Sequence, residues 1–214
     1  MNKITKFILA TVFGIGILFA TTAFIVSDPQ ADFIKQNLSP NDPVHLSDIK
    51  TQHSERGAFK TTVAFKLKNR NSTAKEFYGL KIAIQDNPQV EKIFIGITNN
   101  LISRVEIWNH GQLVTSEELG FMNKMTWGNT QTMSVDFYDQ TNEKYTGKSK
   151  ISMRFYDGTG FGGDIGTLNF DLTAYGDLSS HKSVDVFTRA LDSNISNQPE
   201  FSDLRIWKNY NSFD

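Results

Sequence analysis

The 214-residue chain contains no cysteine and no marked excess of either charge, with 22 Lys and Arg against 23 Asp and Glu. Without cysteine, the chain forms no disulfides and offers no thiolate nucleophile, cysteine-ligated zinc or lipidated N-terminal cysteine. A net charge of −1 gives no basic surplus for holding a phosphate backbone, so we expect no nucleic-acid partner. The hydrophobic content of 39% is that of a folded protein.

One uncharged apolar stretch stands apart from the rest of the chain. Residues 7–26 read FILATVFGIGILFATTAFIV and follow the positively charged Lys3 and Lys6. Twenty apolar residues can cross a bilayer as a helix, whereas a shorter apolar core before small residues such as Thr21 and Ala23 is typical of a cleaved signal peptide. Residues 7–26 are compatible both with a membrane-spanning helix and with a cleaved signal peptide. In either case we expect the lysines to stay in the cytoplasm and the remainder to lie outside, in the periplasm, on the cell surface or secreted.

These features predict three parts: a signal peptide or signal-anchor helix at 1–26, a spacer at 27–43 and one exterior domain at 44–214. Within the spacer, residues 29–38 have the apolar spacing of a short helix. An exterior domain of this size can bury a self-sufficient core without disulfides. Because eukaryotic exported domains of this size more often carry cysteine, we expect a bacterial source.

Apolar and polar residues alternate along much of the exterior domain, as in half-buried strands. Residues 59–68 are an example, with Phe59, Val63 and Phe65 on one side and lysines on the other. We expect this segment to be an edge strand whose lysines discourage pairing with another chain. The other predicted strands are 77–85, 93–98, 104–108, 112–115, 130–139, 150–157, 167–175 and 204–207.

The fold class that follows is mainly β: an antiparallel β-sandwich of about eight or nine strands with one or two short helices. Asn109, His110 and Gly111 lie between two strand segments and predict a hairpin turn. A capped helical turn is expected over residues 116–125. The spacing of residues 184, 187 and 191 predicts a second helix.

Two similar segments, 133–139 and 151–157, share the pattern apolar-Ser-apolar-charge-Phe-Tyr-Asp. We expect them to be adjacent antiparallel strands, with paired residue numbers that sum to about 290 or 292. This register puts Phe137 and Phe155 on one buried face and makes Asp136 and Arg154 direct or diagonal neighbours on the other face. The non-functional interpretation of the similarity is that the two strands lie in similar environments.

The functional interpretation of this pair is a binding surface. Tyr138 and Tyr156 share the face that carries Asp136 and Arg154, and tyrosine combines a flat apolar ring with a hydroxyl group. Trp108 is a further candidate because an indole ring can stack on a sugar ring. These five residues are the ligand-binding candidates.

The chain carries no recognisable catalytic or metal-binding motif. The segment 157–166 has five glycines, but it lacks the oxygen ligands of a calcium loop and the Lys-Ser/Thr of a phosphate loop. The four histidines, His45, His53, His110 and His181, have no metal-ligand spacing. We therefore expect no catalytic residues, metal or cofactor, although carboxylate pairs without a motif leave a glycosidase open.

Three functions remain after these exclusions. The first is a non-catalytic binding or assembly module of the bacterial envelope, with a protein or glycan partner and a membrane contact through residues 7–26. The second is a secreted hydrolase or glycan-active enzyme that uses unmarked carboxylates. The third is a secreted toxin or adhesin. Nothing in the sequence specifies an oligomeric state.

Overall fold

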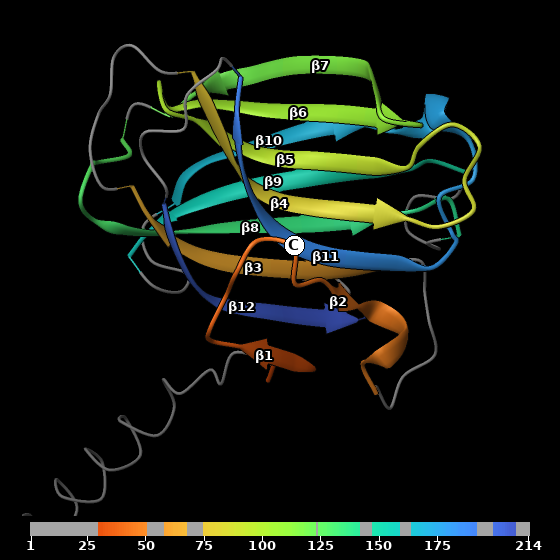
Figure 1. Ribbon diagram of the computed structural model, residues 1–214, viewed down its shortest axis with the longest axis horizontal. Coiled ribbons are helices and arrows are strands. Elements are labelled where there is room, and N and C mark those ends of the chain that lie inside the picture. Colours follow the sequence, from red (N-terminus) through yellow and green to blue (C-terminus); the bar gives the residue numbers. More distant parts are fainter. Residues whose placement is uncertain are drawn as a thin grey trace, which may run out of the picture. The chain divides into compact units, whose positions relative to one another are not determined.

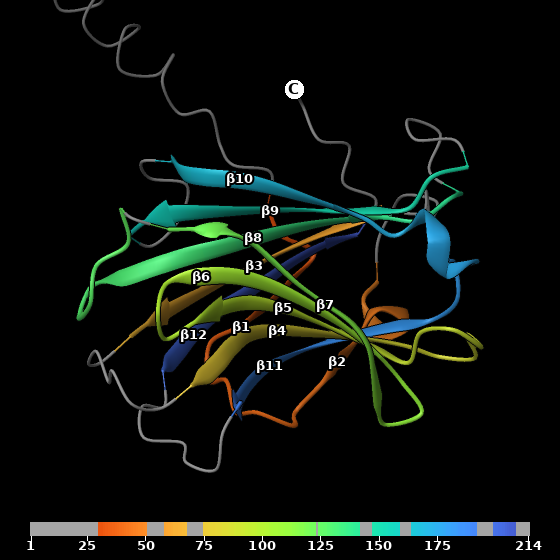
Figure 2. The ribbon, with the colours of Figure 1, turned by 90° about the horizontal axis from the view of Figure 1, so that it is seen from above.

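The alternating segments form twelve β-strands among the described residues of the computed structural model, which are 30–50, 58–67, 75–122, 124–141, 147–158, 164–191 and 199–208. The strands make two antiparallel sheets of six strands each. Figure 2 shows the sheets as two stacked layers. The β-sandwich expected from the sequence is therefore confirmed, with more strands than expected. The N-terminal helix expected before it lies outside the described residues.

Sheet A has the strand order β1-β12-β3-β8-β9-β10. Its central strands β3 and β8 pair without a break from Ala58 with Tyr138 to Lys66 with Thr130. Its strands are β1 (Phe33–Lys35), β12 (Glu200–Lys208), β3 (Ala58–Lys66), β8 (Thr130–Tyr138), β9 (Lys150–Asp157) and β10 (Asp164–Asp171).

Sheet B has the strand order β2-β11-β4-β5-β6-β7. The β6–β7 hairpin confirms the predicted turn: His110 and Gly111 both have positive φ, at 47° and 74°, as a two-residue turn between twisted strands requires. The strands are β2 (Val44–His45), β11 (Lys182–Ala190), β4 (Glu76–Ile84), β5 (Lys92–Thr98), β6 (Ile102–Asn109) and β7 (Gln112–Phe121).

The core lies between the sheets and consists of the inward-facing residue of each alternating pair. On β5, for example, Ile93, Ile95 and Ile97 are buried and belong to the core. On β8 the inward residues Met133, Val135 and Phe137 are also buried there. Burying such side chains stabilises the fold by about 1.5–3 kcal/mol each.

Residues Ala31–Asp214 form one compact unit. It includes β1, which pairs with β12 through Phe33 with Ile206, so the short helix expected over 29–38 is wrong at Phe33–Lys35. The neighbouring β2 pairs with β11 on the other sheet. Figure 1 shows β1 and β2 beside these C-terminal strands. The only regular helical elements of the described residues are two 3₁₀ turns, Leu46–Asp48 and Thr173–Tyr175.

Two predicted helices are wrong, because strand pairing outweighs the local preference. The segment 116–125 continues β7 to Phe121, with Glu118 opposite Arg104 of β6. Residues 184 and 187 belong to β11, which pairs with β4 along its whole length, and residue 191 directly follows this strand. Helix propensity is a weak preference, and tertiary contacts routinely override it.

The edge position expected for residues 59–68 is also wrong, because β3 lies between β12 and β8. Its Lys60 is only 8% exposed. The Lys60 ammonium lies 5.5 Å from the Trp207 ring centroid, and Lys60 pairs with Asp136 across the strands. A ring and a nearby carboxylate both favour a buried ammonium group, so this lysine has a role in packing.

The predicted pairing of β8 with β9 is confirmed, but the register is shifted by two residues from the nearer of the two expected registers. Observed partners such as Met133 and Phe155 have numbers that sum to 288. Phe137 and Phe155 are both buried in the core, as expected. Asp136 pairs with Ser152 and is therefore a diagonal neighbour of Arg154.

The apolar run 7–26 and residues 159–163 of the glycine-rich segment lie outside the described residues. Among the residues that are described, no helix has the length and apolar character needed to span a membrane.

Candidate functional site

The five residues predicted to bind a ligand lie on two different sheets. Asp136 and Tyr138 on β8 and Arg154 and Tyr156 on β9 share the outer face of sheet A. Trp108 lies on β6 of sheet B. The structure thus brings four of the five together and separates Trp108 from them.

Three of the four residues on sheet A are largely inaccessible, and Arg154 is partly exposed. Tyr138 is 4% exposed and Tyr156 is 9% exposed, and the Lys150 ammonium lies 5.3 Å from the Tyr138 ring centroid. Asp136 is 4% exposed, and its Oδ1 atom has no hydrogen-bond partner among the described residues. A ligand role for this group stays a prediction.

Burial raises the pKa of Asp136, because the charged carboxylate loses its hydration; nearby Lys60, Arg154 and Lys150 oppose the shift without reversing it. The carboxyl group of Asp136 is thus easier to protonate in the folded chain than in water.

The outer face of sheet B carries a different group, which we call the aromatic–arginine cluster. It combines four aromatic rings, two arginines and one glutamate. Phe187 packs edge-on against Phe77 and Phe94, with ring centroids 4.9 and 4.8 Å apart. The members of the cluster are Phe77, Phe94, Trp108, Phe187, Arg104, Arg189 and Glu106.

Arg189 lies at the centre of this cluster. Its guanidinium carbon is 4.8 Å from the Trp108 ring centroid, 5.2 Å from that of Phe94 and 5.9 Å from that of Phe77. Arginine stacks well on aromatic faces because its planar charge is weakly hydrated. The arginine therefore fixes three rings relative to one another.

Glu106 holds the polar part of the cluster together. It is 1% exposed, and both of its carboxylate oxygens have partners. Oε1 accepts a hydrogen bond of 2.8 Å from Arg104 Nε; Oε2 accepts one of 2.8 Å from Trp108 Nε1 and pairs with Arg189. A buried carboxylate is tolerated when such partners replace its hydration.

Two glycines make room for these side chains. Gly79 on β4 pairs with Gly96 on β5 beneath the cluster. A Cβ atom on Gly96 would lie 1.9 Å from the Tyr78 carbonyl oxygen, and one on Gly79 would lie 2.1 Å from the Ile95 carbonyl oxygen. Across the neighbouring strands, Phe187 is opposite Gly79 and Arg104 is opposite Gly96, so larger side chains fill the positions beside the glycines.

The cluster is accessible at the side of the β6–β7 hairpin. Trp108 is partly exposed, and its cross-strand neighbour Leu113 is 47% exposed. Glu118 on β7 lies 3.5 Å from Arg104 at the rim, with its side chain 57% exposed. This edge combines an indole ring with hydrogen-bonding groups already fixed in place.

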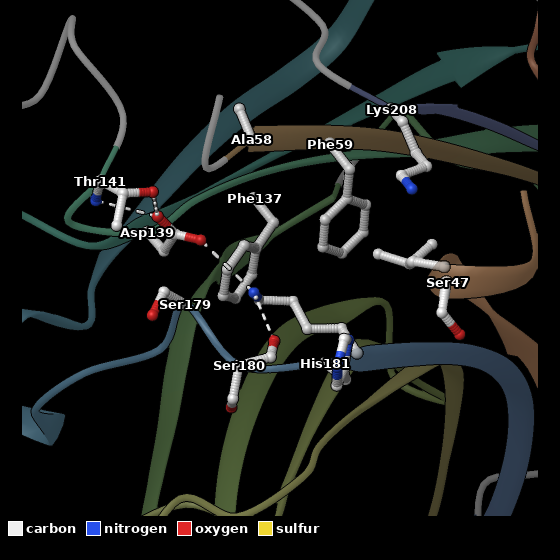
Figure 3. A pocket seen from close by; sticks show the side chains of 12 residues that line it. Ser47, Ala58, Phe59, Phe137, Asp139, Thr141, Ser179, Ser180, His181 and Lys208 are labelled. Carbon is white, nitrogen blue, oxygen red and sulfur yellow. Dashed lines mark hydrogen bonds and ion pairs between the residues drawn. The ribbon is translucent and has the colours of Figure 1, made fainter. Parts of the chain in front are cut away.

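A second feature is a cavity of about 250 Å³ at one end of the sandwich, between the sheets (Figure 3). Phe59 and Phe137 stack over it, with ring centroids 5.2 Å apart and planes inclined by 17°. The other lining residues are Leu46, Ser47, Ala58, Asp139, Thr141, Ser179, Ser180, His181, Lys182 and Lys208.

The aromatic–arginine cluster could have been found from the outward-facing positions of four segments, but not all of these segments were predicted to be alternating strands. Phe94 lies in an apolar run that hides its outward direction, and Phe187 and Arg189 lie in the segment expected to be helical. Alternate positions of β4, β5, β6 and β11 give the cluster directly once all four segments are treated as strands.

Within the described residues, no group of three or more His, Asp or Glu side chains is arranged to hold a metal ion.

Neither a known protein family nor a curated protein matches the sequence. Solved structures with a similar fold include the Ruminococcus gnavus IT-sialidase CBM40 bound to α2,3-sialyllactose, at 12% identity and a TM-score of 0.48, covering 86% of this chain and 95% of that chain. Another is the Caenorhabditis elegans galectin LEC-6, at 11% identity and a TM-score of 0.40, covering 81% and 94%.

A third similar structure is the CBM2 module of the Lactobacillus casei BL23 phage J-1 evolved Dit, at 10% identity and a TM-score of 0.44, covering 75% of this chain and 66% of that chain. The structural neighbours thus include carbohydrate-binding modules and a galectin, all at low identity.

Proposed function

We propose that this chain is a non-catalytic module of the bacterial envelope that binds a neutral glycan beside Trp108. The observation that carries the proposal is the fixed indole. Its Nε1 donates to Glu106, Arg189 stacks on the ring, and part of the ring remains accessible. An indole held in this way offers a flat apolar surface without losing conformational entropy on binding.

Polar groups around the indole supply the second requirement of sugar binding. The apolar C–H face of a pyranose packs on an aromatic ring, while its hydroxyl groups need directed donors and acceptors. Arg104 and Arg189 are partly exposed next to the ring, and ion pairs with the buried Glu106 set their geometry. A preformed arrangement of this kind suits recognition of hydroxyl groups.

The paired charges favour a neutral sugar over an acidic one. Glu106 pairs with both arginines, Glu118 lies 3.5 Å from Arg104, and Lys92 pairs with Glu91 at 2.5 Å. An acidic sugar would have to compete with these carboxylates for the guanidinium groups.

The test is glycan titration of the full-length chain in a non-ionic detergent without a sugar headgroup. Neutral disaccharides should bind, and Trp108→Ala should weaken the affinity by about tenfold or more, because truncated aromatic anchors cause losses of this size. Binding should also change the tryptophan fluorescence, and this change should disappear in Trp108→Phe but persist in Trp127→Phe. Equal affinity of the Trp108→Ala chain would refute the proposal.

A control variant addresses the other sheet. Tyr138→Phe combined with Tyr156→Phe keeps both rings and removes both hydroxyl groups. We expect it to change glycan affinity by no more than about twofold. A tenfold loss would instead favour the face of sheet A that carries Asp136 and Arg154.

The envelope location rests on Lys3 and Lys6 followed by the apolar run 7–26. Sequencing the N-terminus of the protein from its native cell tests it. A start near Phe24 means a cleaved signal peptide, and an intact Lys3 in the membrane fraction means an anchor. An intact N-terminus in the soluble fraction would refute this location.

A further inference from the structure

Strand β7 carries one extra residue beside Trp108. β7 is the edge strand of sheet B and pairs with β6 (Figure 1). Ile107 of β6 pairs with Thr115, but the next residue, Trp108, pairs with Leu113, so Val114 is inserted between the two pairs. Such an insertion is a β-bulge, in which two residues of one strand oppose a single residue of its neighbour. Val114 and Leu113 thus both lie opposite Trp108.

The two bulge residues are exposed apolar side chains. Leu113 is 47% exposed and Val114 is 50% exposed. In the part of the chain that the structure describes, only two other large apolar side chains are exposed, Ile34 on β1 and Phe121 at the other end of β7. Single exposed apolar side chains are ordinary, whereas contiguous apolar surface marks an interaction site. The partly exposed indole of Trp108 and the two bulge residues form such a surface, which is wider than the indole ring alone.

Trp108 has polar neighbours on its other side. Lys92 of β5 pairs with Trp108 across the strands, and its ammonium group lies 2.5 Å from Glu91 Oε1. Glu91 Oε2 accepts a hydrogen bond of 3.3 Å from the backbone nitrogen of Gly111 in the hairpin turn. Cross-strand neighbours have Cβ atoms about 4.5–5.5 Å apart, so a sugar ring stacked on the indole reaches both sides. One side offers charged and polar groups, and the bulge on the other side offers two apolar side chains.

We propose, on the basis of the glycan site proposed above, that the favoured ligand is a neutral sugar carrying a methyl group. The methyl group belongs either to an acetamido substituent or to a 6-deoxy carbon, and it packs on Leu113 and Val114 while the sugar ring stacks on Trp108. The hydroxyl groups of the same sugar face Lys92 and Glu91. A hydroxyl group placed against the bulge would lose water without gaining a hydrogen-bond partner. A methyl group there buries apolar surface and raises the affinity by about fourfold.

Two pairs of sugars test the preference for a methyl group. N,N′-diacetylchitobiose and cellobiose share a β-linked backbone and differ in their acetamido groups, whereas L-fucose and L-galactose differ at the 6-carbon. Each sugar is titrated into the full-length chain in the detergent of the glycan test, and the change in tryptophan fluorescence gives the affinity. We expect the methyl-bearing member of one pair to bind about fourfold more tightly than its counterpart, or better. The pair with the larger affinity ratio identifies the source of the methyl group.

Leu113→Asn tests the position of the methyl group, because it keeps the size of the side chain and removes its apolar surface. The affinity ratio within the preferred pair should fall below about twofold, while the affinity for the sugar without the methyl group should change by less than about twofold. Leu113→Met keeps an apolar side chain and should retain the ratio. The matched control is Ile34→Asn, which removes an isomeric side chain that is 49% exposed on β1 of sheet A. It should leave the ratio unchanged.

Several results would overturn the methyl preference. Equal affinities within both pairs, combined with binding that Trp108→Ala weakens, would refute it and leave the glycan site in place. A ratio that persists in Leu113→Asn would put the methyl group away from the bulge, and loss of the ratio in Ile34→Asn would show an effect unrelated to the bulge. Dissociation of a dimer by Leu113→Asn, with the ratio unchanged, would identify the bulge as a contact between two copies. Absence of binding by all four sugars would refute the glycan proposal itself, so the two failures are distinguishable.

Discussion

The outer faces of the two sheets both bury a carboxylate, but the two carboxylates differ in whether all their oxygen atoms have partners. On sheet B, Glu106 is 1% exposed and has partners on both oxygens. On sheet A, Asp136 is 4% exposed, yet its Oδ1 lacks a hydrogen-bond partner among the described residues. Burial is costly for a charge that is incompletely paired. Similar burial is therefore compensated by partners on sheet B and leaves an electrostatic cost on sheet A.

The largest effect is expected where backbone geometry supports the cluster on sheet B. Gly96→Ala places a Cβ atom 1.9 Å from the Tyr78 carbonyl oxygen, and backbone cannot move aside easily. We expect a loss of about 3 kcal/mol or more in the free energy of unfolding, measured in urea. Gly120→Ala is the control, since the nearest atom to its added Cβ is 3.4 Å away; we expect a change within about 1 kcal/mol. Similar losses in both variants would contradict the close approach at Gly96.

The next largest effect is expected when the central charge of the cluster is removed. Glu106→Gln leaves Arg104 and Arg189 without their shared carboxylate, and we expect it to destabilise the fold by about 3 kcal/mol. Glu118→Gln removes a charge from the same strand pair at a site that is 57% exposed and 3.5 Å from Arg104. Its cost should be below about 1 kcal/mol. If urea denaturation gives equal losses for the two variants, Glu106 has no special role.

The smallest effect, and one of opposite sign, is expected on sheet A. Asp136→Asn removes a carboxylate whose pKa is raised by burial, and we expect it to stabilise the fold at pH 7 by about 1 kcal/mol. The raised pKa means that the folded chain binds this proton more readily than the unfolded chain. The contribution of Asp136 to stability is then fully present below the unfolded pKa of 3.8 and is lost as the pH rises through the higher folded value.

Urea unfolding at several pH values above 4 provides the measurement. The stability of Asp136→Asn relative to the unmodified chain should increase with pH until the carboxyl group of the folded chain is ionised. Asp157→Asn, at the exposed end of β9, should change the stability at pH 7 by no more than about 0.5 kcal/mol. A less stable Asp136→Asn chain at pH 7 would mean that contacts with Lys60 and Arg154 outweigh the cost of burial.

Alternation was enough to predict the strands whose partners also alternate. Leu80 and Ile82 on β4 face the core as their spacing requires. The strand at residues 93–98 was predicted from an apolar run instead, and that run did not show that Phe94 points outward. Residues 184–191 satisfy a helical spacing as well as an alternating one, and only the pairing of β11 with β4 decides between them. Local pattern therefore predicts the fold class better than the exact number of strands.

The candidate site was less predictable because its parts meet only after the sheet has formed. Trp108 was identifiable as an aromatic residue beside a hairpin turn. Its contact with Arg189 depends on the order β11-β4-β5-β6, which places distant segments side by side. Glu106 and Arg189 are separated by 83 residues, and no short-range pattern links them.

The pairing of the first strands with the last ones has a consequence for synthesis on the ribosome. β1 and β2 precede the other described strands in the chain, but their partners β12 and β11 follow all of the others. β3, at the centre of sheet A, also waits for β12. Each sheet therefore lacks at least one strand until β11 and β12 have been synthesised. The finished sandwich forms only after translation has passed residue 208.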